Sequence, residues 1–256
     1  MIKKKIKQLL VNLINLITSK IKVFPDQFKK VYNIEFQGIK IFFIPQNDIT
    51  YRRWKVFERN GKEKNTIDWI DTFEKNSIFF DIGANVGVFS IYAALKKKVE
   101  VYAFEPEPNS FIDLFNAIQI NKANVIPMLV PLADQTNCNF FNLSKNFEPA
   151  SSGHIFGNKD DKKLNYAVCA DTIDNLILNK KIPQPNYIKI DVDGLEEKVI
   201  SGLDTVIKGN TLKSILIEFM HEEQKFFYKD YLRKNGYFLK DGPSGNNRNY
   251  IFSKEK

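Results

Sequence analysis

The sequence has few of the residues and patterns that identify the common small-domain and membrane classes. Its 256 residues include two cysteines, Cys138 and Cys169, without C-x-x-C spacing or companion histidines, so neither a disulfide framework nor a zinc module is indicated. At 43% hydrophobic and 27% charged residues, the chain is neither disordered nor a multi-pass membrane protein. We therefore expect a reducing compartment and two cysteines that behave as buried apolar residues.

A strong charge on the folded body is also missing, although the net charge is +8. Residues 1–30 hold eight lysines and one acid, Asp26, so this segment carries +7 and the rest of the chain only +1. A nucleic-acid-binding domain would need its basic residues on the folded surface that meets phosphate. The near-neutral body therefore argues against a nucleic-acid partner.

The N-terminal segment has the pattern of a basic amphipathic helix. Apolar residues recur at three- and four-residue steps through residues 2–22, lysines and asparagines fill the intervals, and Pro25 ends the pattern. Such a helix can lie in the headgroups of an anionic membrane, or it can pack on its own domain with a solvated lysine face, and the sequence favours neither. It is too short and too polar to span a membrane.

The remainder predicts a single α/β domain. We divide the chain into a helix at 1–24 and a domain at 25–256, with an N-terminal extension at 25–75 and a Rossmann-like core at 76–256. Short apolar runs alternate with helical patterns through the core, which predicts a mostly parallel sheet with helices on both faces. The expected strands are 78–82, 99–104, 125–130, 187–191 and 214–219, followed by an antiparallel pair at 236–239 and 250–253. The expected helices of the core are 88–98, 109–121, 195–208 and 222–235, and residues 34–57 are expected to form short strands and turns.

Acidic residues and a glycine-rich turn mark one edge of this predicted sheet. Asp81, Glu105, Asp191 and Glu218 each lie at or near the end of a strand, where ligands of open α/β sheets bind. The turn at 81–87 reads DIGANVG, which has neither the dinucleotide G-x-G-x-x-G pattern nor a phosphate-binding loop. An acid before the glycines and amide donors after them suit the amino-acid end of S-adenosylmethionine, and Glu105 suits its ribose hydroxyls.

Five strings in order resemble the FkbM family of S-adenosylmethionine-dependent methyltransferases. They are FFDIGANVGVFS, VYAFEPEPNSF, PLAD, YIKIDVDGLEEKVISGL and ILIEF. The resemblance runs from about Arg53 to the last strand. It implies a seven-stranded Rossmann-like methyltransferase sheet whose last strand is antiparallel.

The same resemblance implies the cofactor-binding residues. It places the methionine part of the cofactor on the 81–87 turn, the ribose on Glu105, and the adenine amino group near Asp134. From the residues alone, Asp134 could equally be a turn residue. The predicted cofactor-binding set is Asp81, Gly83, Ala84, Asn85, Gly87, Glu105, Pro106, Ala133 and Asp134.

Catalysis needs a group that aligns the acceptor and removes a proton from an alcohol. We predict Asp191, Glu218 and His221 for this role, although His221 could equally be a surface residue. Asp191, Asp193 and Glu218 could instead hold a divalent cation that polarises an acceptor oxygen. His154 lies in an irregular segment expected to overhang the pocket.

The resemblance implies O-methylation of a hydroxyl on a saccharide or related small molecule, and we expect a bacterial surface glycan or its precursor. We expect a cytoplasmic enzyme, which would contact the inner membrane peripherally if residues 2–22 take the membrane-bound of their two alternatives. Two alternatives remain open at this point, an NAD-type Rossmann oxidoreductase and a non-catalytic membrane-associated protein with a vestigial cofactor pocket.

Overall fold

The computed structural model describes residues 30–58, 63–144, 153–179, 181–192, 194–219, 222–242 and 248–255. The chain divides into two units, Met1–Val31 and Tyr32–Lys256, and the second unit contains the folded domain. The predicted N-terminal helix lies outside the described residues. In the described part of the chain, no helix is long and apolar enough to cross a membrane.

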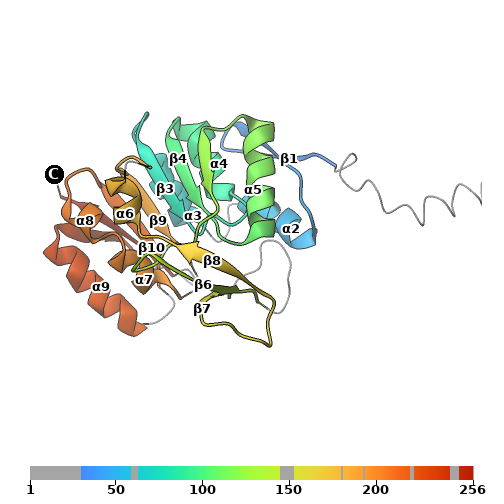
Figure 1. Ribbon diagram of the computed structural model, residues 1–256. Helices are drawn as coiled ribbons and strands as arrows, with labels where there is room; N and C mark the ends of the chain where they lie inside the picture. The colour runs from blue at the N-terminus through green and yellow to red at the C-terminus, as the bar shows by residue number, and fades with distance from the viewer. Residues whose placement is uncertain are drawn as a thin grey trace, which may run out of the picture. The chain divides into compact units, whose positions relative to one another are not determined.

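The centre of the domain is a seven-stranded sheet (Figure 1). Its strand order is β11-β12-β10-β9-β3-β4-β5, and all neighbouring pairs are parallel except those that β12 makes with β10 and β11. The predicted mostly parallel sheet with an antiparallel last strand is confirmed. The strands are β3 (Ile78–Ile82), β4 (Glu100–Phe104), β5 (Val125–Met128), β9 (Tyr187–Ile190), β10 (Ser214–Glu218), β11 (Tyr237–Asp241) and β12 (Asn249–Lys254).

Both faces of this sheet are covered by helices, as the side-chain alternation of the strands requires. In β3, Phe79 packs into one hydrophobic cluster, whereas Phe80 and Ile82 pack into another on the opposite face. The first cluster includes residues of α3 (Lys64–Asp71), α4 (Val88–Lys97) and α5 (Pro108–Asn121). The second includes residues of α6 (Ile173–Leu178), α7 (Glu196–Ser201), α8 (Asp204–Lys208) and α9 (Glu222–Lys234).

An N-terminal hairpin and helix extend the first cluster. Strands β1 (Tyr32–Phe36) and β2 (Ile39–Phe43) pair antiparallel, and Phe43 stacks on Trp54 of α2 (Asp48–Glu58) with 5.2 Å between ring centroids. The sequence predicted only short strands and turns in this stretch. The helix α2 begins where the Asn47 side chain accepts a hydrogen bond from the Thr50 amide at 2.8 Å, and it buries Thr50, Trp54 and Phe57.

A separate three-stranded sheet, which we call the insert sheet, follows β5. It has the order β7-β6-β8 and contains β6 (Asn137–Asn142), β7 (Ile155–Gly157) and β8 (Asn165–Ala170). In Figure 1 it lies below the main sheet. The Tyr166 hydroxyl donates a hydrogen bond to the Pro106 carbonyl and so ties this sheet to the loop after β4.

The insert sheet corrects the prediction for the cysteines. Cys138 and Cys169 form a disulfide, and both are exposed where burial as apolar residues was expected. The physical reason is the register of β6 against β8, which places these two residues directly opposite each other. The two cysteines are 31 residues apart in the sequence, so their pairing depends on strand register and cannot be predicted from their spacing.

One helix expected from the sequence is divided in two. The pattern 195–208 predicted a continuous helix, but α7 ends at Ser201 and α8 begins at Asp204. Gly202 lies between them, and a Cβ on it would stand 2.1 Å from the Ala133 carbonyl oxygen. The chain therefore passes directly against the segment after β5 at this point.

Candidate functional site

A cavity of about 340 Å³ opens at the carboxyl ends of β3, β4, β9 and β10. This is the edge of the sheet at which the sequence placed the acidic residues. Phe141 of β6 and His154, directly before β7, contribute to its wall, and the N-terminal extension contributes Arg53 and Glu63. The remaining lining residues are Ile82, Gly83, Asn85, Phe104, Glu105, Pro106, Val130, Pro131, Leu132, Asp191, Val192, Leu195 and Glu218.

The turn after β3 bends sharply against the end of β9. Gly83 has φ +79°, and a Cβ on it would lie 1.8 Å from the Asp191 carbonyl oxygen, so no side chain fits there. The amides of Gly83 and Ala84 both donate to the Phe104 carbonyl, each at 3.0 Å. Gly87, with φ +87°, then starts α4. The turn is thus fixed against the neighbouring strands and exposes Gly83 and Asn85 to the cavity.

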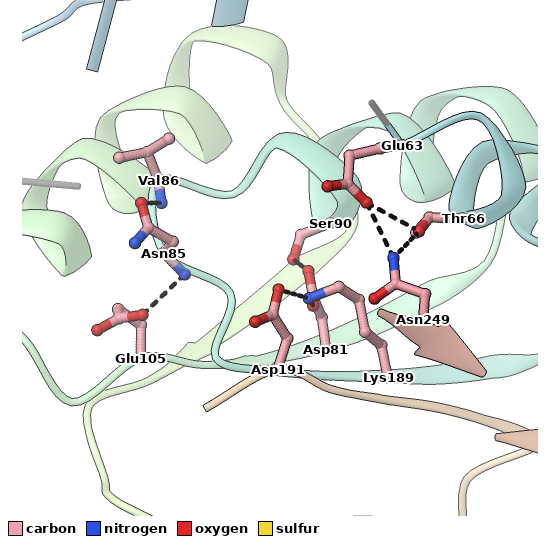
Figure 2. A network of polar contacts seen from close by, with 10 residues as sticks. All are labelled: Glu63, Thr66, Asp81, Asn85, Val86, Ser90, Glu105, Lys189, Asp191 and Asn249. Carbon is pink, nitrogen blue, oxygen red and sulfur yellow. Dashed lines mark hydrogen bonds and ion pairs between the residues drawn. The ribbon is translucent and has the colours of Figure 1, made fainter. Parts of the chain in front are cut away.

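Glu105 lines the cavity beside this turn. Its Oε2 accepts a hydrogen bond from the Asn85 amide at 2.7 Å, which Figure 2 shows, and its Oε1 accepts one from the Glu107 amide at 2.8 Å. Burial raises the pKa of this carboxyl to about 7, although both amide bonds act in the opposite direction. Each oxygen keeps a second acceptor position, so Glu105 can also bind ligand hydroxyls.

Next to the cavity lies a charged group on neighbouring strands. Asp81 of β3 and Lys189 of β9 are opposite each other in the sheet register, with Lys189 Nζ 3.7 Å from Asp81 Oδ1. Lys189 Nζ also donates to Asp191 Oδ2 at 2.9 Å, and Ser90 Oγ donates to Asp81 Oδ2 at 2.6 Å. Figure 2 shows the Lys189 side chain beside Asp81, with a dashed line from its Nζ to Asp191.

Asp191 and Glu218 form a carboxyl pair on the cavity side of this group. Burial alone would raise the pKa of Asp191, but the positive charge of Lys189 and the hydrogen bond from Glu218 hold it below its usual value. Burial, together with the hydrogen bond and charge of Asp191, raises the pKa of Glu218 to about 8. At neutral pH the pair therefore shares one proton, held mainly by Glu218.

Only part of the predicted cofactor set lines the cavity. Gly83, Asn85, Glu105 and Pro106 do, whereas Ala84 and Gly87 do not. Asp81 is fully buried behind Lys189 and does not reach the cavity.

The residues predicted near the adenine also lie off the cavity wall. Ala133 is buried and Asp134 is exposed. Their neighbours Pro131 and Leu132 line the cavity in their place. The cofactor contacts proposed for Asp81, Ala133 and Asp134 thus remain predictions.

The predicted catalytic and metal-binding residues are only partly described. Asp191 and Glu218 lie together at the cavity, but His221 and Asp193 are outside the described residues. Within the described ranges, no group of three or more His, Cys, Asp or Glu residues is arranged to hold a metal ion. His154 lies at the cavity as expected, with its Nδ1 accepting from the Ser144 amide at 3.1 Å.

Sequence reasoning missed Lys189, Arg53 and Glu63. The signal for Lys189 was a lysine inside a four-residue strand that is otherwise apolar or aromatic, two residues before Asp191. Arg53 and Glu63 gave no comparable signal, because they reach the cavity from α2 and from the start of α3, far away in sequence.

Strand order, the glycine turn after β3 and the acid after β4 together form a Rossmann-like fold of the methyltransferase type. The family model described as the methyltransferase FkbM domain matches residues 81–239, more than half of the sequence. The chain belongs to the FkbM methyltransferase family. Of the alternatives left open by the sequence, this match favours the methyltransferase over the oxidoreductase.

Two similar proteins are informative. The hexuronic acid methyltransferase AglP of Haloferax volcanii is 23% identical over 155 residues, which cover 60% of this chain and 62% of that relative. The crystal structure of methyltransferase FkbM from Methylobacillus flagellatus aligns with a TM-score of 0.50 and 15% identity, over 71% of this chain and 44% of that one. The chain thus spans less than two thirds of either relative, and the second comparison supports the fold alone.

Proposed function

We propose that this methyltransferase transfers the methyl group of S-adenosylmethionine to a hydroxyl of a saccharide, such as a surface glycan or its precursor. The observation that carries the proposal is one cavity with a nucleoside-binding end, the 83–85 turn with Glu105, and a proton-accepting end, Asp191 with Glu218. The name of the relative AglP supports an acceptor of the sugar-acid class.

The cavity residues fit the cofactor. Glu105 is fixed by two amides and has acceptor positions left for two ribose hydroxyls. The apolar side chains of Phe104, Val130 and Leu132 provide a surface for a planar base. The cofactor, when bound, supplies a sulfonium methyl group that is ready for in-line displacement.

The chain must then align the acceptor oxygen and take its proton. Asp191 is held ionised by Lys189 and can accept a hydrogen bond from the acceptor hydroxyl. The pKa of Glu218 is about 8, close to physiological pH. Its ionised form can therefore take up the hydroxyl proton as the methyl–oxygen bond forms. The two carboxyl groups thus act as one proton-accepting pair.

Four other lining residues suit a polar ring compound. Arg53, Glu63 and His154 offer charged and hydrogen-bonding groups, and Phe141 offers an apolar ring face. Such a mixed set of side chains can pair with the hydroxyl groups and the C–H faces of a saccharide.

Three finer predictions belong to the same proposal. The need for a divalent cation is tested by measuring activity after chelation. One of the three predicted ligands, Asp193, lies outside the described residues. The cytoplasmic location and the contact of residues 2–22 with anionic membranes are tested by fractionation of the full chain and of a chain lacking residues 1–24. The disulfide argues against the reducing compartment expected from the sequence, so alkylation of Cys138 and Cys169 in cells tests the cytoplasmic location, and protection of both thiols from alkylation would contradict it.

The binding half of the proposal is tested by calorimetry with S-adenosylhomocysteine and with NAD. We expect one site for the former and none for the latter. Glu105→Gln should weaken S-adenosylhomocysteine binding, because an amide is a poorer acceptor for ribose hydroxyls. Glu100→Gln, at the opposite end of the same strand, is the matched control and should bind like wild type. Binding of NAD alone would contradict the proposal.

A further inference from the structure

Lys189 is a buried cation in the middle of the sheet. Its side chain is 2% exposed, and its neighbours along β9, Ile188 and Ile190, are fully buried. In the sheet register it lies between Asp81 of β3 and Leu216 of β10. Since burying a charge costs more than burying an apolar side chain of similar size, stability alone does not explain a lysine here.

The contacts of Lys189 are unequal. It donates to Asp191 at 2.9 Å, whereas Asp81 Oδ1 is 3.7 Å away and has no hydrogen-bond partner. The other Asp81 oxygen is occupied by Ser90. The ammonium also lies 5.3 Å from the centroid of the Phe89 ring. Asp81 therefore acts on Lys189 as a fixed counter-charge, and the directed bond of Lys189 goes to Asp191.

Asp191 is the member of this group that meets the cavity. Its backbone is already held, because its amide donates to the Ile82 carbonyl at 3.0 Å and its carbonyl packs against Gly83. Its side chain is 34% exposed. Lys189 therefore restrains the remaining freedom of this residue, the rotation of the carboxylate.

We propose that Lys189 is a positioning residue for methyl transfer: it holds the Asp191 carboxylate toward Glu218 and the acceptor, and Asp81 acts through Lys189 without touching the cofactor. The proposal rests on the proposed function and deepens it. It differs from the expectation that Asp81 binds the methionine part of the cofactor directly.

The test separates orientation of the acceptor site from cofactor binding. Lys189→Met keeps an unbranched side chain one atom shorter and removes its charge, Lys189→Arg keeps the charge, and Asp81→Asn removes the counter-charge. Each full-length variant is measured for kcat, for KM of S-adenosylmethionine, for Kd of S-adenosylhomocysteine and for urea stability. Asp113→Asn is the control, because Asp113 is also buried, accepts a hydroxyl bond at 2.7 Å from Thr50, and is not a cavity residue.

We expect Lys189→Met to lower kcat about 100-fold, since a displaced catalytic group costs about that much, with KM and Kd within about threefold of wild type. Lys189→Arg should recover part of kcat. Asp81→Asn should lower kcat in the wild-type background. In the double variant with Lys189→Met it should have little further effect on kcat, because both changes remove the same interaction between Asp81 and Lys189. Asp113→Asn should change stability only.

Two results would overturn the proposal. One is a kcat of Lys189→Met equal to that of wild type. The other is a loss of S-adenosylhomocysteine binding in Asp81→Asn that is larger than its loss of kcat, since this would place Asp81 on the cofactor. If Lys189→Met does not fold, Asp81→Asn and Ser90→Ala decide by the same comparison of kcat with Kd. A wild-type chain that neither binds S-adenosylhomocysteine nor methylates a saccharide would refute the proposed function itself.

Discussion

Replacing Gly83 by alanine tests the close approach of the glycine turn to β9. Alanine at φ +79° costs about 1–2 kcal/mol, the penalty of the left-handed region. The new Cβ would also stand 1.8 Å from a backbone oxygen that cannot rotate away, and overpacking of this kind adds roughly 1–3 kcal/mol. The expected total is therefore about 2–5 kcal/mol of unfolding free energy.

Gly38→Ala is the matched control for this change. Gly38 has φ +77°, but nothing lies within 4 Å of a Cβ placed on it, so only the conformational penalty remains. Urea denaturation of both variants, compared at equal m-values, isolates the steric part as the difference, about 1–3 kcal/mol. Gly38→Ala should also keep wild-type activity. Equal destabilisation of the two variants would refute the close approach.

Three further predictions concern the titrating groups and the disulfide. Because the pKa of Glu218 is raised to about 8, kcat should increase as the pH rises through 8. Glu218→Gln should abolish this increase and lower kcat at least about 100-fold. A wild-type kcat that does not change with pH would contradict the role of Glu218 as proton acceptor. The pKa of Glu105 is raised from 4.5 to about 7, so its contribution to the stability of the ligand-free chain is present below pH 4.5 and lost as the pH rises through 7. The affinity for S-adenosylhomocysteine should increase over the same rise in pH. In Glu105→Gln, urea titrations should not show the stability change and calorimetry should not show the affinity change. Reductant should lower the unfolding free energy of the wild type by about 3–4 kcal/mol, because it opens the loop closed by the Cys138–Cys169 disulfide. It should leave Cys138→Ser unaffected. An equal response of the wild type and Cys138→Ser would show that the two cysteines are not bonded.

Much of the fold could be predicted because its signals are local. The run 78–82 coincides with β3, and the predicted helices at 88–98 and 109–121 match α4 and α5 within one residue at each end. The antiparallel end of the sheet could be predicted from the short connection between its last two strands. Alternation of strands and helices then left few arrangements other than a parallel sheet.

The remaining parts of the fold depend on contacts between distant segments. Helix α2 is stabilised by packing of Trp54 on Phe43 and by the hydrogen bond that Thr50 donates to Asp113 of α5. The disulfide depends on the register of β6 against β8. The break between α7 and α8 lies at Gly202, which the segment after β5 approaches closely.

The candidate site divides in the same way. The strand ends located Glu105, Asp191 and Glu218, because the topology brings the carboxyl ends of parallel strands to one edge. The sequence could not show that Asp81 is covered by Lys189, since this depends on which strand pairs with β3. It also could not show that Arg53 reaches the cavity from the N-terminal extension.

The central claim is that the cavity beside Glu105 and Asp191 delivers a methyl group to a saccharide oxygen. The most direct test is mass spectrometry of glycan precursors, including hexuronic-acid-containing ones, incubated with the full-length chain and methyl-labelled S-adenosylmethionine. We expect a product that is one labelled methyl group heavier with wild type and with Glu100→Gln, and a strongly reduced yield with Glu218→Gln. Label on a non-saccharide acceptor only, or equal yields from all three proteins, would contradict the claim.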